Sequence, residues 1–372
     1  MSTTFDERMM RRALALSRRG EGWVEPNPMV GCVMVRNGRV VGEGFHRRFG
    51  GAHAEVEALR CCDGKARGAT VYVTLEPCCH VGKTPPCAEA LIEAGVRKVV
   101  VAVRDPNPLV GGRGLRRLRS AGIQVVTGML RDEAAEILAP FFTRMVHHRP
   151  YVIVKWAQSL DGKLVTRAGE SKWISGEASR REVHKLRARV DAVLVGAGTV
   201  LCDDPRLTAR GVRVRRVATR AVLDGRLRIP GDSHLVRSAK EFPTVVFIAS
   251  ASSKGRKAER LGRAGVEIVS VPAARNGLDL ARVLKHLAAR GVTNLLVEGG
   301  PTVLAAFFEG GWVDEAWVFT APRFIGGRAA SGIFERMSAD RLFDARVPFR
   351  VTVRRIGEDV LHRMRFTRPP TR

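Results

Sequence analysis

The sequence contains no apolar run as long as the roughly 20 residues that a transmembrane helix requires, so it predicts no membrane partner. It also lacks the dense cysteine spacing of a disulfide-stapled secreted domain, because only seven cysteines occur in 372 residues. That scarcity favours a reducing, cytoplasmic location. Residues 9–16 are basic, but their apolar part is too short for a secretory signal and indicates an amphipathic first helix.

The remaining composition is typical of a globular protein. Hydrophobic residues make up 45% of the chain and charged residues 27%, and 372 residues suffice for two domains with separate cores. Two histidines followed by Arg149 and Pro150 predict the boundary between them. The expected domains are residues 1–148 and 149–372.

One stretch carries a metal-binding pattern. His53 is followed two positions later by Glu55, and Cys78 and Cys87 each come directly after a proline. One imidazole and two thiolates make a three-ligand zinc site whose fourth tetrahedral position is left for water. The order matches the zinc deaminase signature, in which the metal activates a water and the glutamate moves protons. The sequence therefore predicts one zinc ion per chain, with Glu55 as the catalytic residue.

The spacing of the two cysteines departs from that signature. Eight residues separate Cys78 from Cys87, where the usual pattern has two. Glycine and prolines within the insert permit it to loop out and return. Its His80 and Lys83 are expected to lie over the metal and to meet an anionic or carbonyl-bearing substrate.

The run from His53 to Cys87 closely resembles the deaminase half of the bifunctional riboflavin-biosynthesis deaminase/reductase family. Ordinary cytidine and tRNA-adenosine deaminases have the short spacing instead. The resemblance implies substrate binding by Asn27, His46, His80 and Lys83. Independently, a pyrimidinone ring needs amide-type donors and acceptors, and a ribose phosphate needs a cation such as Lys83. For His46 the interpretation as a structural histidine with satisfied hydrogen bonds stays open.

Two other interpretations of this stretch are weaker. A structural zinc site usually has four protein ligands and no neighbouring glutamate. A phosphate-binding loop would need glycine five residues before the pair Gly82-Lys83, and Pro77 stands there. The remaining cysteines of the stretch are expected to be bystanders: Cys61, Cys62 and Cys79.

Strands and helices alternate through the first half. Hydrophobic runs predict strands at 32–35, 40–44, 70–75 and 98–103, and Asn37-Gly38 predicts a hairpin between the first two. Helices are expected at 5–19, 53–59, 87–95 and 132–143. Such alternation is typical of an α/β layered domain with its site at strand ends. The resemblance implies a cytidine-deaminase-like α/β/α domain.

Acidic residues are scarce: 37 Asp and Glu oppose 63 Lys and Arg, which gives a net charge of +26. A surplus of this size is typical of nucleic-acid-binding proteins. Residues 1–150 carry only +8 of it and the remainder +18. A deaminase acting on RNA or DNA should have its basic surface beside the zinc, so we favour sites for phosphorylated small molecules and no nucleic-acid partner.

The family resemblance continues in order after residue 150 and thins after about Gly327. The matching segments are 155–163, 169–175, 186–187, 198–210 and 297–302. The family's reductases are similar in fold to dihydrofolate reductase and use NADPH, so a second α/β domain of that kind is expected.

The resemblance also implies which residues form the second site. The NADPH site is expected to contain Ala157, Trp173, Thr199, Asp203, Gly300, Pro301, Thr302, Val303, Leu304, Ala305 and Ala306. Substrate binding is implied for Lys155, Ser171, Arg187, Leu207, Arg210 and Glu298, with the arginines holding the phosphate. Where many relatives have Asp-Ser, this chain has Asp224-Gly225. A hydroxyl contact to the 2′-phosphate is then missing, and nearby basic residues such as Arg226 would have to replace it.

The segment around Gly299-Gly300 supports a cofactor site on its own. Residues 294–297 predict a strand and 302–308 a helix. Two glycines let a ligand approach the backbone, and Pro301 suits a first helical position. The N-terminal NH groups of such a helix favour a pyrophosphate. The sequence has no Rossmann fingerprint.

These features together predict a bifunctional enzyme acting twice on a phosphorylated pyrimidine ribotide. The first step is deamination of 2,5-diamino-6-(5-phosphoribosylamino)pyrimidin-4(3H)-one, and the second is NADPH-dependent reduction of the ribosyl group to ribityl. Lys155, Asp203 or Glu298 could relay a proton in the second step. The alternatives are a nucleic-acid deaminase with an accessory domain and a non-catalytic zinc-bearing binding protein. A homo-oligomer is also expected.

Overall fold

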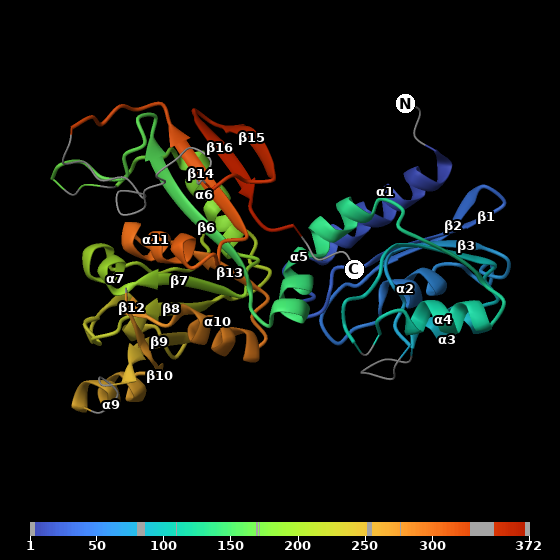
Figure 1. The fold of residues 1–372 in the computed structure, drawn as a ribbon, viewed down its shortest axis with the longest axis horizontal. Helices are drawn as coiled ribbons and strands as arrows, with labels where there is room; N and C mark the ends of the chain where they lie inside the picture. The colour runs from blue at the N-terminus through green and yellow to red at the C-terminus, as the bar shows by residue number, and fades with distance from the viewer. Residues whose placement is uncertain are drawn as a thin grey trace. The chain divides into compact units, whose positions relative to one another are not determined.

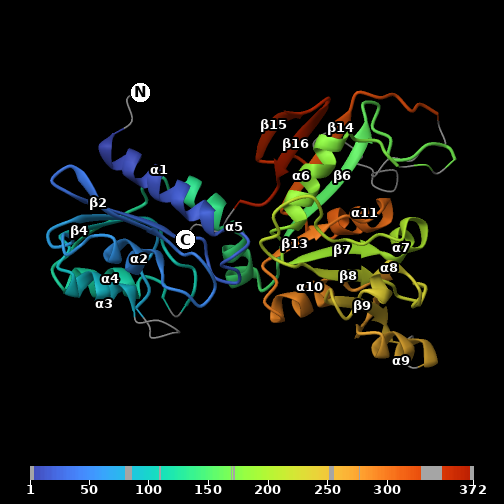
Figure 2. The same cartoon turned by 180° about the vertical axis from the view of Figure 1, so that it is seen from behind.

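A computed structural model describes residues 4–79, 86–108, 110–168, 170, 172–250, 255–275, 277–327 and 346–368. The chain forms two compact units that divide between Arg149 and Pro150, and the second unit spans Pro150–Arg368. Each unit is built on its own β-sheet (Figures 1 and 2). Every helix among the described residues falls short of the length and hydropathy of a bilayer span.

The first unit is a five-stranded sheet between two helical layers. Its strand order is β2-β1-β3-β4-β5, in which β2, β1 and β3 are antiparallel neighbours and β3, β4 and β5 are parallel. The strands are β1 (Gly31–Arg36), β2 (Arg39–Phe45), β3 (Thr70–Leu75), β4 (Lys98–Val103) and β5 (Gln124–Thr127). The helices are α1 (Phe5–Ser17), α2 (Ala54–Arg60), α3 (Cys87–Glu93), α4 (Arg113–Ser120) and α5 (Arg131–His147), with a short 3-10 turn at Arg18–Gly20. In Figure 1, α1 and α5 cover one face and α2, α3 and α4 the other.

Local sequence explains these elements. Thr4 and Glu7 form a capping box at the start of α1, so two helix-terminal NH groups are satisfied. The predicted hairpin is confirmed, because Asn37 and Gly38 have φ values of 51° and 72° and join β1 to β2. β3 and β4 are almost wholly buried apolar runs, as expected of parallel strands covered on both faces.

Close packing of α2 on β2 fixes where the first site begins. A Cβ at Gly44 would lie 2.3 Å from the carbonyl oxygen of Ala54, and one at Gly42 would lie 2.4 Å from that of Ala58. Only glycine permits this approach of helix backbone to strand. The first turn of α2 is thereby held against the sheet.

The second unit is a nine-stranded sheet of order β10-β9-β8-β7-β13-β6-β14-β16-β15. The strands from β10 to β14 are parallel, and β16 and β15 add an antiparallel edge. The strands are β6 (Tyr151–Ser159), β7 (Ala192–Gly196), β8 (Thr219–Leu223), β9 (Thr244–Ala249), β10 (Val266–Val271), β13 (Asn294–Val297), β14 (Glu315–Ala321), β15 (Arg350–Ile356) and β16 (Asp359–Arg365). A separate two-stranded ribbon consists of β11 (Ala273–Ala274) and β12 (Gly277–Leu278).

Helices connect the parallel strands of this unit. They are α6 (Glu177–Arg187), α7 (Ala197–Asp203), α8 (His234–Arg237), α9 (Arg256–Arg263), α10 (Leu280–Ala289) and α11 (Pro301–Glu309). Val283 and Leu287 of α10 and Leu304 and Phe307 of α11 pack with strand residues such as Leu194 in one buried cluster. Because the strands are parallel, their carboxyl ends share one edge of the sheet, where ligands bind in α/β folds.

Candidate active sites

His53, Cys78 and Cys87 come together at one end of the first sheet. His53 is the N-cap of α2, Cys78 follows β3, and Cys87 is the first residue of α3. His53 Nδ1 lies 3.2 Å from Cys87 Sγ and 3.6 Å from Cys78 Sγ, and all three donor atoms lie within 4.8 Å of one another. Tetrahedral zinc with ordinary bond lengths separates its nitrogen and sulfur ligands by about 3.6 Å. The donor types and their spacing therefore fit zinc.

The surroundings of Cys78 and Cys87 shift the pKa values of their thiols. Hydrogen bonds from the Cys87 side chain, from His53 and from the Cys87 backbone NH lower the pKa of Cys78 to about 4. The same contact with Cys78, together with burial, raises the pKa of Cys87. Cys78 is thus a thiolate at neutral pH, which is the form that binds metals. A cation is needed before Cys87 loses its proton as well.

Glu55 faces this group from the first turn of α2. Its side chain is only 3% exposed and hydrogen-bonds the Cys87 thiol. Burial first, and then the negative charge on Cys78, raise its pKa to about 7. A buried carboxyl with such a pKa beside a metal site is suited to taking up and releasing protons near neutrality.

His46 and Asn27 form a hydrogen-bonded pair next to the metal ligands. His46 Nδ1 lies 2.9 Å from the carbonyl oxygen of Ala52, and its Nε2 lies 3.2 Å from Asn27 Nδ2. The His46 ring is 2% exposed and meets the ring of His53 edge-on at 5.4 Å. With both nitrogens occupied, His46 fits the structural interpretation better than direct substrate contact. Asn27 is partly exposed, and its position is set by His46. The other two predicted contacts, His80 and Lys83, lie outside the described residues.

The second unit contains a cleft of about 2000 Å³ along the carboxyl edge of its sheet. This exceeds the roughly 300–1,000 Å³ of a single-ligand pocket, so a cofactor and a substrate fit together. Most residues predicted for the second site line it: Lys155, Ala157, Trp173, Arg187, Thr199, Asp203, Leu207, Arg210, Glu298, Gly300, Pro301, Thr302, Val303, Leu304 and Ala306. Ala305 is 4% exposed and does not line the cleft, and its part in the cofactor site stays a prediction. Ser171 lies outside the described residues.

A buried ion pair lies in this cleft. Arg187 donates from Nε to Glu298 Oε1 at 2.6 Å and from Nη2 to Oε2 at 2.8 Å. Burial alone would raise the pKa of Glu298, but Arg187 and Lys155 outweigh it and lower that pKa. Burial lowers the pKa of Lys155, and the charge of Glu298 offsets part of this effect. The lowered pKa makes the Lys155 ammonium group a stronger acid, and the carboxylate of Glu298 lies near it.

Arg210 is better placed than Arg187 to bind a phosphate. Arg187 already has a carboxylate partner, whereas Arg210 is exposed. Burial and the like charges of Arg187 and Arg206 lower the pKa of Arg210. One carboxylate for three guanidinium groups leaves excess positive charge, which favours an anion.

Sequence reasoning missed part of this cluster. Arg180 and His184 line the cleft from the same helix as Arg187. His184 Nδ1 accepts a hydrogen bond from the backbone NH of Arg210, and the Arg180 guanidinium stacks 4.6 Å from the ring of Trp173. The sequence did contain a pattern that predicts these two residues. Positions 180, 184 and 187 follow the i, i+4, i+7 spacing of a helix and so share one face.

The turn before α11 is open to the cleft. Gly300 is the N-cap, Pro301 is the first helical residue, and no side chain caps the helix. A Cβ at Gly299 would lie 2.6 Å from Val303 Cβ, whereas one at Gly300 would meet nothing within 4 Å. Pro301 has no NH, and the NH of Val303 donates to the carbonyl oxygen of Gly300 at 3.1 Å, so within the first turn the NH of Thr302 is the group that could meet a pyrophosphate. This part of the cleft fits NADPH.

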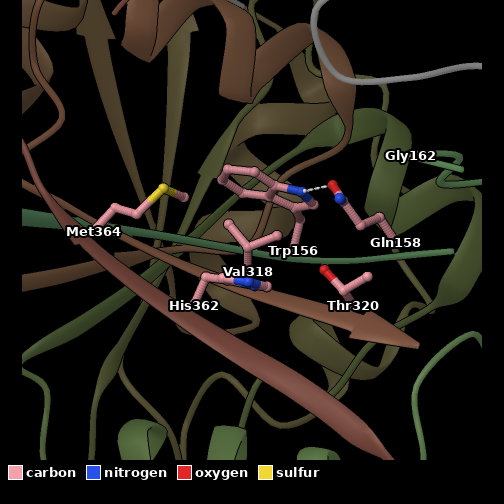
Figure 3. Close-up of a pocket in the computed structure, with 7 residues that line it drawn as sticks. All are labelled: Trp156, Gln158, Gly162, Val318, Thr320, His362 and Met364. Atoms are coloured by element: carbon pink, nitrogen blue, oxygen red, sulfur yellow. Dashed lines mark hydrogen bonds between the residues drawn. The ribbon is translucent and has the colours of Figure 1, made fainter. Parts of the chain in front are cut away.

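A smaller hollow of about 400 Å³ lies over β6, β14 and β16 (Figure 3). Trp156 Nε1 donates to Gln158 Oε1 at 2.8 Å in it, beside Thr320, His362 and Met364. None of the residues predicted for either site lines it, so we assign it no part in the chemistry.

Comparisons with known proteins agree with this geometry. A family model described as the RibD C-terminal domain matches residues 150–361. A second, described as the cytidine and deoxycytidylate deaminase zinc-binding region, matches residues 3–103. The riboflavin biosynthesis protein RibD of Aquifex aeolicus is 42% identical over 97% of this chain and 98% of its own length. The chain belongs to the RibD family.

Other RibD proteins support the same assignment. Escherichia coli RibD is 40% identical over 95% of this chain and 98% of its own length. The solved structure of Acinetobacter baumannii RibD superposes with a TM-score of 0.86 at 37% identity, covering 98% of this chain and 99% of that one. A deaminase/reductase structure from Thermotoga maritima gives 0.84 at 36% identity, with the same coverage. As a RibD protein, this chain is a bifunctional deaminase and reductase of riboflavin biosynthesis, with zinc and NADPH as cofactors.

Proposed function

We propose that residues 1–148 deaminate 2,5-diamino-6-(5-phosphoribosylamino)pyrimidin-4(3H)-one and that residues 149–372 reduce the ribosyl group of the product, 5-amino-6-(5-phosphoribosylamino)uracil. The observation that carries the first half is the convergence of three zinc-type donor atoms within 4.8 Å, with the buried carboxyl of Glu55 against them. A structural zinc site would not need that carboxyl. The second half rests on the cleft that holds Lys155, Glu298 and the open end of α11.

In the deaminase, His53 Nδ1, Cys78 Sγ and Cys87 Sγ would hold the metal. Bound zinc lowers the pKa of a coordinated water from about 16 towards 7. Glu55 would take the proton that this water loses and give it to the ring nitrogen next to C2. It would then take the proton of the new hydroxyl on C2 and give it to the departing amino group, as the C2 carbonyl forms. The balance is one water consumed and one ammonia released. His46 fixes Asn27, whose amide offers a donor and an acceptor to the pyrimidinone.

In the reductase, NADPH supplies the hydride that reaches C1′ of the ring-opened substrate. The NH of Thr302 at the start of α11 would hold the cofactor's pyrophosphate, and Arg210 would bind the substrate phosphate. Of the three candidates for proton relay we favour Lys155. Asp203 is tied to Lys172 at 2.9 Å, and the lowered pKa of Glu298 leaves that carboxyl without a proton at neutral pH. Lys155 Nζ would deliver its proton to the nitrogen bonded to C1′.

Two variants on the same helix test the deaminase assignment. Glu55→Gln should lower the rate of ammonia release by at least about 10²-fold, because general acid–base catalysis contributes that much. Zinc content and NADPH oxidation with the deaminated ribotide should be unchanged. Glu57→Gln is the matched control, since Glu57 pairs with Arg47 and Arg60 on the surface. Ammonia release that survives in Glu55→Gln would refute the proton-shuttle role.

The remaining partner assignments are also proposals. We propose no nucleic-acid partner, since part of the basic surplus of the second unit lines its cleft. We propose a homo-oligomer, because Val351 and Val353 are exposed on β15 at the edge of the sheet, and unpaired edge strands recruit further chains. None of the seven cysteines, all of which are described, forms a disulfide, which suits the cytoplasm. Light scattering and salt-dependent RNA binding would test the first two.

A further inference from the structure

A segment without regular secondary structure carries two of the residues assigned to the reductase substrate. Residues 205–210 form neither helix nor strand, yet Leu207 and Arg210 both line the cleft. Leu207 has φ of 55°, a left-handed conformation that costs free energy for a residue with a side chain. Its side chain is only 3% exposed, so it anchors the segment in the core. Such a conformation persists only where the surrounding structure holds it.

Helix α6 holds this segment from the other side. The backbone NH of Arg210 donates to His184 Nδ1 at 3.2 Å. The His184 ring also hydrogen-bonds the backbone of Thr208, and Arg187 Nη1 donates to the Thr208 carbonyl oxygen at 3.4 Å. Positions 184 and 187 are three apart and share one face of the helix. That face therefore fixes the segment on both sides of position 209.

The hydrogen bond from Arg210 requires a neutral imidazole, because Nδ1 accepts only when it carries no proton. Burial first, and then the charges of Arg187 and Arg210, lower the pKa of His184. The charge of Glu298 and the hydrogen bond with Thr208 oppose this shift only in part. The neutral ring is therefore favoured, and the contact with Arg210 persists at neutral pH.

The same contacts determine where the guanidinium group of Arg210 lies. Arg210 is exposed, and its Nη1 donates to Thr208 Oγ1 at 3.4 Å, within the segment that His184 holds. A long side chain binds an anion more tightly when its backbone is already fixed, because less conformational entropy is lost on binding. Fixing the Arg210 backbone should therefore strengthen its bond to a phosphate.

We propose that His184 is a positioning residue of the reductase: it holds the Arg210 backbone where the guanidinium group meets the substrate phosphate, and it thereby sets the preference for a phosphorylated substrate. The proposal rests on the reductase half of the proposed function. His184 acts through Arg210, because the Arg210 NH occupies its Nδ1. As a neutral ring it adds no charge of its own to the phosphate site.

Two substitutions of similar shape separate the hydrogen bond from the packing. In His184→Asn a side-chain oxygen can take the place of Nδ1 and accept the Arg210 NH, whereas His184→Leu has a methyl group there. Initial rates of NADPH oxidation by the full-length protein would be measured with 5-amino-6-(5-phosphoribosylamino)uracil and with the same compound after phosphatase treatment.

His184→Leu should raise KM for the phosphorylated substrate by about tenfold, the worth of one charge-assisted hydrogen bond. Its kcat should stay unchanged, because the phosphate contact is made equally in the ground state and the transition state. Its kcat/KM for the dephosphorylated compound should also stay unchanged. His184→Asn should remain close to the wild type with both compounds.

A double-mutant cycle with Arg210→Gln tests whether His184 acts through Arg210. In the Arg210→Gln background, His184→Leu should no longer change KM for the phosphorylated substrate, and additive effects of the two substitutions would contradict the proposal. Lys185→Gln is the matched control, because Lys185 is exposed on the same helix, pairs with Glu182 and does not line the cleft.

The proposal is overturned if His184→Leu impairs both substrates equally or neither, if His184→Asn behaves as the leucine variant does, or if Lys185→Gln has the same effect. Fluorescence titration with NADPH checks that the second unit is folded, and His184→Ala replaces any leucine variant that fails this check. A wild-type protein that reduces both compounds equally well also overturns the proposal. A wild-type protein that oxidises no NADPH with either compound would instead remove the reductase assignment, and this inference with it.

Discussion

Glu298→Gln is the most informative single change, because it separates stability from catalysis. The substitution keeps the shape of the side chain and removes its charge, which leaves the buried guanidinium of Arg187 without its bidentate partner. The two side chains are 14% and 8% exposed, so water can compensate little. Breaking such a pair by removing one partner costs about 3–5 kcal/mol of unfolding free energy. At about 2–4 °C per kcal/mol for a unit of this size, Tm should fall by about 10 °C.

The same variant should alter the pH dependence of NADPH oxidation. Burial lowers the pKa of Lys155, and the charge of Glu298 opposes that shift. Removing this charge lowers the pKa of Lys155 further. If Lys155 donates the proton, the alkaline limb of the kcat/KM profile moves to lower pH, because the ammonium form is lost earlier.

Calorimetry and a pH series of initial rates measure the two effects. Glu182→Gln, on the helix that carries Arg187, is the control, since the pair that Glu182 makes with Lys185 lies at the surface and is worth little. An unchanged Tm would contradict the buried-pair argument. A lower Tm with an unmoved alkaline limb would remove Lys155 from the proton transfer while leaving the ion pair intact.

Three further results are expected. Removal of zinc by a chelator should abolish ammonia release, which stoichiometric zinc restores, while oxidation of NADPH with the deaminated ribotide continues. Burial alone would raise the pKa of Glu315, but Arg363 and Arg365 lower it. Its contribution to stability is therefore complete above its unfolded pKa of about 4.3 and is lost as pH falls, so Glu315→Gln should flatten acid denaturation curves between about pH 5 and 3. Gly44→Ala should displace α2, since its Cβ would meet the carbonyl oxygen of Ala54, and zinc affinity measured by competition should drop.

Local features of the fold and site could be predicted because their causes are local. Residue types and spacing alone indicated His53, Cys78 and Cys87, and the structure brings their donor atoms together. The helix predicted at 53–59 is Ala54–Arg60, with His53 as its extended N-cap. The hairpin at Asn37-Gly38 was readable because only a few residue types tolerate positive φ at both positions.

Other features depend on contacts between distant segments. Arg187 and Glu298 are 111 residues apart, so their pairing, and the consequence that Arg210 is the freer phosphate ligand, needed the tertiary structure. Whether His46 touches substrate depended on Asn27 and Ala52 occupying both ring nitrogens.

The position of β6 has a consequence for synthesis of the chain. This strand is the first of its unit, yet both of its partners in the sheet, β13 and β14, begin at residue 294 or later. At roughly 5–20 residues per second a ribosome needs about 10–30 s to supply them. During that interval both edges of the apolar strand β6 are unpaired. The deaminase unit has by then been synthesised and can fold. Chaperones should therefore bind the second half of the nascent chain more than the first half.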